Sequence, residues 1–166
     1  MALTVFNTNT AGLAGAIAAG VLTYARYRLF DITIILNGAL GGLVAITAGP
    51  HLYETLDAII IGGIGGSLVV FAVPLFDKIR IDDPVGALSV HLINGVWGTL
   101  AVGLFAADPA NGVTFLNQLK GVAVIAVFVF AVSFGIIYLI NKVFPFRASD
   151  EEQVQGLDVS ECGLEA

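Results

Sequence analysis

The 166-residue chain is far more apolar than a soluble domain: hydrophobic residues make up 57% and charged residues only 12%, about half the soluble average. This composition excludes an ordinary soluble protein. The net charge of −6 comes from the end of the chain, because residues 148–166 hold six acidic residues and no basic ones, against seven of each in residues 1–147. The charge pattern gives no support to nucleic-acid binding.

Five long stretches without charged residues predict five transmembrane helices. A helix rises about 1.5 Å per residue, so roughly 20 apolar residues cross the hydrocarbon core of a lipid bilayer. The helices are apolar on all sides, which argues against a soluble bundle. We therefore predict an all-α, polytopic integral membrane bundle over residues 1–147, followed by an acidic tail over 148–166. The predicted helices lie near 5–25, 32–49, 57–75, 84–106 and 115–142.

The basic residues predict how the helices cross the cell membrane. If the helices alternate in direction, six basic residues fall on one side and only Lys120 falls on the other. Basic residues collect on the cytoplasmic side, so the N-terminus is predicted outside and the tail in the cytoplasm. An external start without a signal peptide leads us to expect a truncated gene, a split half or an internal start. The six residues are Arg26, Arg28, Lys78, Arg80, Lys142 and Arg147.

Glycines in the second and third predicted helices indicate close helix packing. Gly38 and Gly42 form one small-xxx-small pair, and Gly62 and Gly66 form another. Such pairs let two membrane helices approach closely. The glycine-rich run 62–66 is not a nucleotide loop, because it lies inside an apolar span and not between a strand and a helix.

The fourth predicted helix opens with Asp82, Asp83 and Pro84. A carboxylate can accept hydrogen bonds from the free N–H groups at a helix start, and proline fits the first turn. The main role expected for Asp83 and Pro84 is therefore to start this helix.

His91 is the one ionisable side chain well inside a predicted span, seven residues after Pro84 and about 10 Å along the helix. At about 100° per residue it shares a stripe with Gly95, Gly98 and Val102, and Asn94 lies about 60° away. Two interpretations stay open. His91 is either a neutral side chain hydrogen-bonded to another helix or a pore-lining proton acceptor.

The remaining chemistry-bearing residues predict no catalytic site. His51 follows Gly49-Pro50 in a polar connection and is interpreted as a surface histidine. No cluster of histidine, cysteine and carboxylate residues has metal-ligand spacing, and no nucleophile–base pair occurs. We therefore expect neither an enzyme nor a cofactor. The single cysteine, Cys162, can form no internal disulfide.

Four segments resemble the ammonium transporter (Amt) family, which is related to Rh proteins. Asp82-Asp83-Pro84, then Val90-His91 and the run 95–105, are similar to the tenth family helix. The resemblance covers nearly the whole chain, as helices seven to eleven of an eleven-helix fold, and is nearest to bacterial and cyanobacterial members. Further similar segments are Asn7–Ala11 to the start of the seventh helix, Asn37–Gly49 to the eighth, and Gly156–Ser160 to the cytoplasmic tail signature.

The resemblance implies a homotrimer with one pore per subunit that transports ammonium or ammonia. His91 would be the second of two pore histidines, with Asp83 and Pro84 at the start of the pore helix and Gly95 and Gly98 in its packing. A PII-type signal protein would bind at the cytoplasmic face. The first pore histidine, the phenylalanine gate and the outer recruitment site belong to the preceding helices of the family fold.

The chain departs from the family pattern at two positions. Pro50 stands where a cysteine is common, and Cys162 stands where the tail often has histidine. The second departure is expected to weaken contacts of the tail. The sequence thus leaves three functions to weigh: part of a conducting pore, a non-conducting fragment or accessory subunit that assembles with other transporter chains, and an ammonium sensor.

Overall fold

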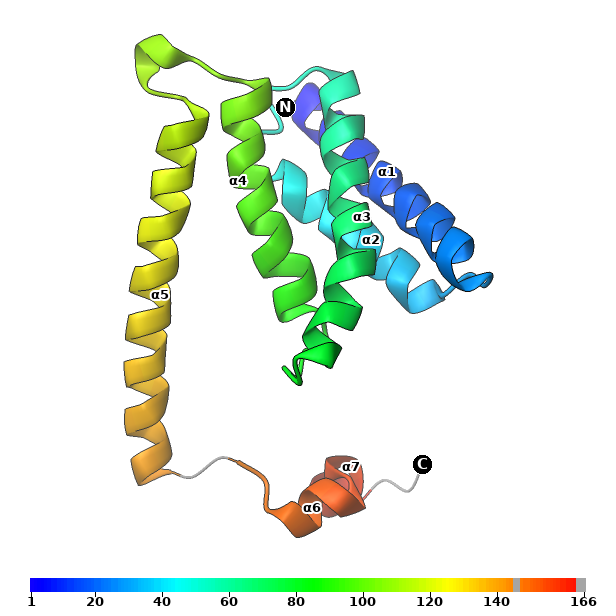
Figure 1. Ribbon diagram of the computed structural model, residues 1–166, viewed down its shortest axis with the longest axis vertical. Helices are drawn as coiled ribbons and strands as arrows, with labels where there is room; N and C mark the ends of the chain where they lie inside the picture. The colour runs from blue at the N-terminus through cyan, green and yellow to red at the C-terminus, as the bar shows by residue number, and fades with distance from the viewer. Residues whose placement is uncertain (145–146, 164–166) are drawn as a thin grey trace. The chain divides into compact units, whose positions relative to one another are not determined.

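The computed structural model describes residues 1–144 and 147–163, and its regular structure there is helical (Figure 1). The elements are α1 (Ala2–Tyr27), α2 (Ile32–Ile46), α3 (Thr55–Lys78), a π-helical segment η1 (Ala87–Leu92), α4 (Ile93–Phe105), a short 3-10 turn η2 (Pro109–Asn111), α5 (Phe115–Val143), α6 (Asp150–Gln155) and α7 (Leu157–Cys162). They fall into two compact units, Met1–Ala123 and Val124–Ala166.

The five helices predicted from the apolar stretches are all present. In the described residues α1, α3, α5 and the combined segment Ala87–Phe105 are long and apolar enough to cross a membrane. The exception in length is α2, which has 15 residues and extends only about 22 Å at the helical rise. It ends at Ile46, three residues before the predicted end, and the chain continues through turns to the start of α3.

Small residues bring α1 into backbone contact with both α2 and α3. A Cβ atom added at Gly42 of α2 or at Gly62 of α3 would overlap the Ala11 carbonyl of α1. A Cβ at Gly66 would overlap the backbone of Gly15, also in α1. Helices this close gain van der Waals contact along their backbones, which is the main source of helix association in lipid. The predicted small-residue pairs therefore lie where the helices approach most closely.

We predict that Gly66→Ala separates α1 from α3 and lowers the thermal stability of the purified chain. Overpacking of this kind costs about 1–3 kcal/mol, because the added methyl group meets backbone and not a flexible side chain. Thermal unfolding in detergent, followed by circular dichroism, measures the loss. Gly63→Ala is the matched control, since a Cβ at Gly63 has no atom within 4 Å. Equal melting temperatures for the two variants would contradict the close contact.

A buried asparagine joins the start of α1 to the connection before α3. The Asn7 side chain is fully buried, and its Nδ2 donates hydrogen bonds to the Pro50 carbonyl at 3.0 Å and the Tyr53 carbonyl at 2.8 Å. Its Oδ1 accepts one from the Thr55 hydroxyl at 3.3 Å. Buried backbone carbonyls need such partners, so Asn7 fixes this connection against the first helix.

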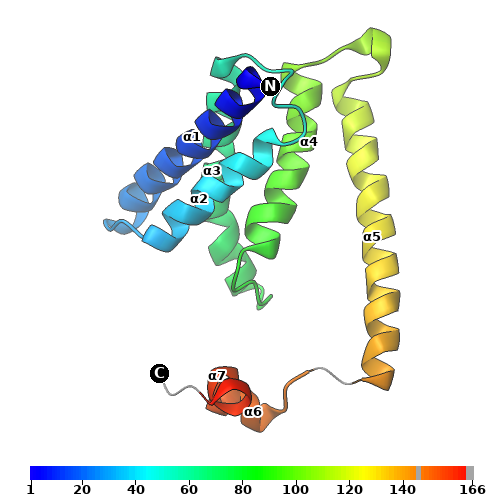
Figure 2. The same cartoon turned by 180° about the vertical axis from the view of Figure 1, so that it is seen from behind.

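The fourth crossing segment packs against the other helices of the first unit. In Figures 1 and 2, α4 runs beside α2 and α3, and both helices contact it. A Cβ at Gly98 of α4 would overlap the backbone carbonyl of Ala45 in α2. The same principle of close backbone approach that joins α1 to its neighbours therefore also positions α4.

Within the second unit, the described part of the tail forms two short helices. Ser149 and Glu152 make a capping box at the start of α6: the Glu152 N–H donates to the Ser149 hydroxyl, and the Ser149 N–H donates to the Glu152 carboxylate. Gly156 separates α6 from α7. Such reciprocal caps favour a helix even in a short acidic segment.

Candidate functional site

The segment before α4 takes a conformation that the sequence pattern did not predict. We expected a helix beginning at Pro84, but Pro84 lies in a turn and the helical winding begins at Ala87. Gly86 has φ 75° in the left-handed region, where side chains other than glycine are strained. A Cβ there would also lie 2.7 Å from Val90 Cγ2. The chain therefore turns sharply just before the segment that carries His91.

The segment that carries His91 is wound as a π-helix, η1, over Ala87–Leu92. The His91 N–H donates to the Gly86 carbonyl five residues back at 3.2 Å, and the Ile93 N–H reaches the Leu88 carbonyl. A π turn holds one more residue than an α turn, is uncommon, and occurs often at functional sites. The helix therefore changes from π to α winding directly after His91, between Leu92 and Ile93.

Asp83 receives two backbone N–H groups of this π turn. Its carboxylate accepts hydrogen bonds from Leu88 N–H at 2.9 Å and Ser89 N–H at 2.8 Å. Partial desolvation acts to raise the pKa of Asp83, but these hydrogen bonds outweigh it and hold the pKa below its usual range. Asp83 is therefore an ionised acceptor that satisfies N–H groups which the start of a helix leaves free.

His91 and two residues of its predicted stripe differ in exposure. His91 is exposed on the first unit, while Gly98 and Val102, which would share its face in a regular α-helix, are buried. Gly95 remains open, since a Cβ there would have no atom within 4 Å. Among the residues that the structure describes, Gly98 lies against α2, and the packing role of Gly95 stays a prediction.

Asn94 is a buried polar residue of the site that sequence reasoning noted only as a neighbour of His91. It is fully buried, and its Nδ2 donates to the Val90 carbonyl of the π turn at 3.0 Å. Its amide fits between two glycines, because a Cβ at Gly41 of α2 or at Gly65 of α3 would lie 2.9 Å from one of its terminal atoms. In the sequence, Asn94 could have been found as a polar residue inside an apolar span whose neighbouring helices carry glycines, Gly41 and Gly65.

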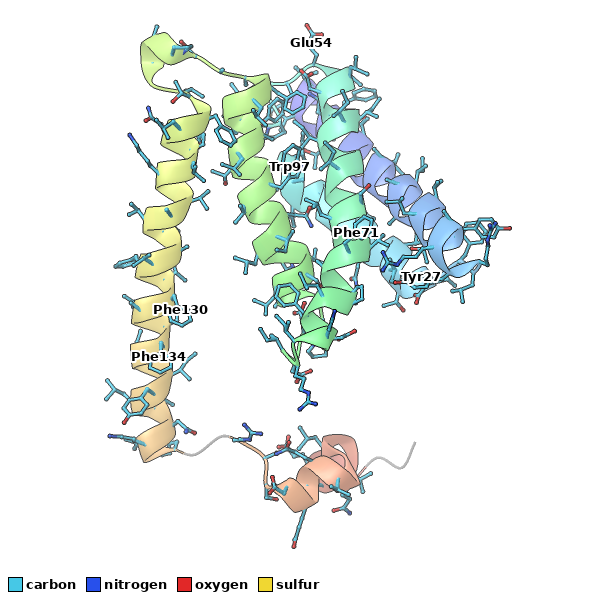
Figure 3. All side chains as sticks on the ribbon, viewed as in Figure 1. Tyr27, Glu54, Phe71, Trp97, Phe130 and Phe134 are labelled. Carbon is cyan, nitrogen blue, oxygen red and sulfur yellow. The ribbon has the colours of Figure 1, made fainter. Side chains whose placement is uncertain are left out.

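Trp97 makes the next contact along α4. Its indole Nε1–H donates to the Ile61 carbonyl of α3 at 3.0 Å, and Figure 3 shows the side chain directed toward that helix. Indole N–H groups usually find a partner when they are buried. Trp97 therefore fixes α4 against α3 rather than facing lipid alone.

The structure does not bring the two histidines together. His51 is exposed in the turns before α3, and His91 follows α3, a helix of 24 residues or about 36 Å. Among the described residues no group of three histidine, cysteine or acidic side chains could hold a metal ion. The candidate site is thus an exposed imidazole near the start of the apolar span Ala87–Phe105.

These features define a polytopic α-helical membrane protein. The match to the Ammonium Transporter Family model extends over residues 1–166, and the chain belongs to that family. Ammonium transporter Amt2 of Archaeoglobus fulgidus is 34% identical over 93% of this chain. The ammonium transporter of Bacillus subtilis is 34% identical over 96% of it. The proteins of this family are transporters and not enzymes.

Solved structures agree with the sequence relatives. A structure described as a sensor Amt protein matches 96% of the chain with a TM-score of 0.82 and 33% identity. Candida albicans Mep2 matches 90% of the chain with a TM-score of 0.78 and 26% identity. The chain spans 36% and 43% of the length of the two sequence relatives named above, and 42% and 37% of the two structures.

We predict that the stability contributed by Asp83 disappears in acid. An aspartate in an unfolded chain has a pKa of about 3.9. Because the folded value is lower, the contribution is fully present above the unfolded pKa and is lost as the pH falls through the folded one. The melting temperatures of the unmodified chain and of Asp83→Asn should therefore differ above about pH 5 and converge in stronger acid. A constant difference down to strong acid would contradict the hydrogen-bonded carboxylate.

Proposed function

We propose that this chain forms part of a membrane pore for ammonium or ammonia, with His91 lining the path. The observation that supports this most directly is the exposure of the His91 imidazole on an otherwise apolar span of a family member. An ionisable side chain inside a membrane is costly, and such residues mark substrate pathways more often than other positions do.

The chemistry of imidazole suits this substrate. An ammonium ion cannot enter an apolar passage cheaply with its charge, whereas neutral ammonia both donates and accepts hydrogen bonds. Neutral imidazole donates through one nitrogen and accepts through the other. His91 can therefore bind ammonia in either orientation and can take up a proton that ammonium loses. By resemblance it is the second histidine of the family pair.

The chain is shorter than its relatives, and a second function therefore has to be tested beside the pore. The matched segment is about two-fifths of the Bacillus subtilis relative. The alternative is an accessory or non-conducting chain that assembles with other ammonium transporter chains. We favour the pore assignment when the chain is combined with the rest of the fold, and we expect little transport by the chain alone.

Assembly and signalling partners follow from the resemblance. A homotrimer would leave one pore in each subunit, and a PII-type signal protein would act at the cytoplasmic face. The acidic segment 148–155, with its capped helix α6, would lie on that face. A sensor role is a further possibility of the family, since one similar structure is described as a sensor Amt protein.

We propose the cell membrane as the location, with the N-terminus outside and the tail in the cytoplasm. The charge split among the spans supports this orientation. At the end of α1, the Arg26 guanidinium carbon lies 5.5 Å from the ring centroids of Tyr27 and Phe71 (Figure 3). Aromatic and basic side chains together are typical of a membrane–water interface.

The orientation predicts which cysteines an impermeant maleimide can reach in intact cells. Cys162 should react only after the membrane is permeabilised, because the tail is cytoplasmic. In a Cys162→Ser background, Asn111→Cys in the connection before α5 should react from outside. Labelling at one position shows that the reagent is active when the other is protected. Labelling of Cys162 but not of Asn111→Cys in intact cells would contradict the proposed orientation.

The role of His91 is tested in a complemented pore. The chain is co-expressed with the part of the Bacillus subtilis relative that precedes the matched segment, and methylammonium uptake and charge movement are measured in parallel. We expect His91→Ala to change the uptake rate or its coupling to charge, because alanine can neither donate nor accept a hydrogen bond. His51→Ala, an exposed histidine outside the spans, is the matched control.

Two results would count against these assignments. Robust uptake by residues 1–166 alone would contradict the expectation that the rest of the fold is needed. Unchanged uptake and current in the complemented His91→Ala pore would remove the proposed role of the histidine.

A further inference from the structure

Three aromatic rings and a lysine lie in a row along α5, within the second unit. The ring centroids of Phe130 and Phe134 are 6.1 Å apart, and those of Phe134 and Tyr138 are 6.3 Å apart. Lys142 continues the row, with its Nζ 4.7 Å from the Tyr138 centroid. Because each step is four residues, the four side chains share one side of the helix, and Figure 3 shows the first two rings on the same side of α5. We call this row the aromatic–lysine face.

The aromatic–lysine face is open to the surroundings of the chain. Phe130, Phe134 and Tyr138 keep 74%, 63% and 53% of their surface exposed, and none of the described residues of α5 is buried. The helix is long and apolar enough to cross a membrane. Exposed rings on such a helix lie at the depth of the lipid acyl chains.

The charge of Lys142 has no acidic partner in its own helix. No Asp or Glu occurs between Asp108 and Asp150, and Lys142 lies one residue before the end of α5 at Val143. A lysine stem can lie along apolar surface while its ammonium reaches the headgroup region. The ammonium has three N–H donors, so its contact with the Tyr138 ring leaves donors for an anionic acceptor.

The bulk of the rings argues against another membrane helix as the occupant. Helices in lipid associate through small residues that permit close approach, as α1 does with α2 and α3. On α5 the small residues Ala131 and Gly135 lie about 100° around the axis from the rings. The combination of apolar rings and one cation instead matches an amphipathic molecule with a negative headgroup.

We propose that the aromatic–lysine face binds an anionic phospholipid, with the phosphate on the Lys142 ammonium and an acyl chain along the three rings. The row extends about 18 Å from Lys142 to Phe130 at the helical rise. This length is close to the roughly 15 Å of hydrocarbon in one leaflet. The site depends on α5 crossing the membrane, and not on the pore role of His91.

Tryptophan fluorescence measures which lipid contacts this face in the full-length chain. Trp97→Phe removes the single native tryptophan, and Phe134→Trp places a reporter in the middle of the row. The chain is reconstituted in phosphatidylcholine vesicles that contain a fixed fraction of dibrominated phosphatidylglycerol or dibrominated phosphatidylcholine, whose bromine atoms quench on contact. We expect the relative binding constant to favour phosphatidylglycerol about fivefold, which corresponds to the roughly 1 kcal/mol that one basic residue contributes near an anionic surface.

Removing the charge of Lys142 should remove the preference. With Lys142→Gln the ratio is expected to approach one, while brominated phosphatidylcholine still quenches because the rings still face lipid. Lys120→Gln is the matched control and should leave the ratio unchanged. Lys120 is the other lysine of α5 and lies about 21 Å along the helix from the reporter.

The position of the reporter tests whether the preference belongs to this face. Ile136 is exposed on α5 at a similar depth but about 200° around the axis from Phe134. A reporter introduced there as Ile136→Trp, with Phe134 retained, should show a weaker preference for phosphatidylglycerol. Equal preferences at the two positions would indicate a general attraction to the membrane surface and would overturn the proposed site.

Salt tests the charge interaction in a chain that keeps Lys142, so this test does not depend on the folding of the lysine variant. High salt should lower the preference for phosphatidylglycerol, because mobile ions screen the headgroup charge. A preference unchanged by both salt and Lys142→Gln, or a ratio of one at the Phe134→Trp reporter, would overturn the proposal. Absence of quenching by either brominated lipid would also overturn it, since another chain would then cover the face. None of these outcomes bears on transport, so the proposed function stands or falls separately.

Discussion

The close contact of α1 with α2 and α3 is the constraint on which the rest of the first unit depends. Apolar side chains gain little from burial when the surroundings are lipid, so the helices are held by backbone proximity. Ala11 and Gly15 of α1 meet glycines of both partners, and any added methyl group would overlap backbone. A small residue at each of these positions is therefore required by geometry.

Glycine contacts and hydrogen bonds then hold α4 against α2 and α3. Gly98 lies against the Ala45 carbonyl, and Trp97 donates to the Ile61 carbonyl. The Asn94 amide fits between Gly41 and Gly65 and holds the π turn through the Val90 carbonyl. Two further glycines, next in sequence to Gly42 and Gly66, thus leave room for the buried Asn94 amide. The turn that carries His91 is in this way tied to the contacts of α4 with α2 and α3.

The sequence predicted the helices well and the local winding poorly, for physical reasons. Uninterrupted apolar length sets a membrane helix, so the five helices and the small-residue contacts at Gly42, Gly62 and Gly66 could be predicted. The start of α4 could not, because Pro84 has every local property of a first helical residue. The outcome depends on which acceptor the Leu88 and Ser89 N–H groups find. A helix from Pro84 was consequently predicted where the chain forms a turn and then a π-helical segment.

The central claim is that contacts of the buried Asn94 amide with α2 and α3 hold the turn that carries His91. Gly65→Ala tests it most directly, because a Cβ there would lie 2.9 Å from Asn94 Oδ1, whereas a Cβ at Gly63 in the same helix has no atom within 4 Å. The measurement is the maleimide labelling rate of His91→Cys in the Cys162→Ser background. The account predicts a changed rate with Gly65→Ala and an unchanged rate with Gly63→Ala. Identical rates in both variants would contradict it.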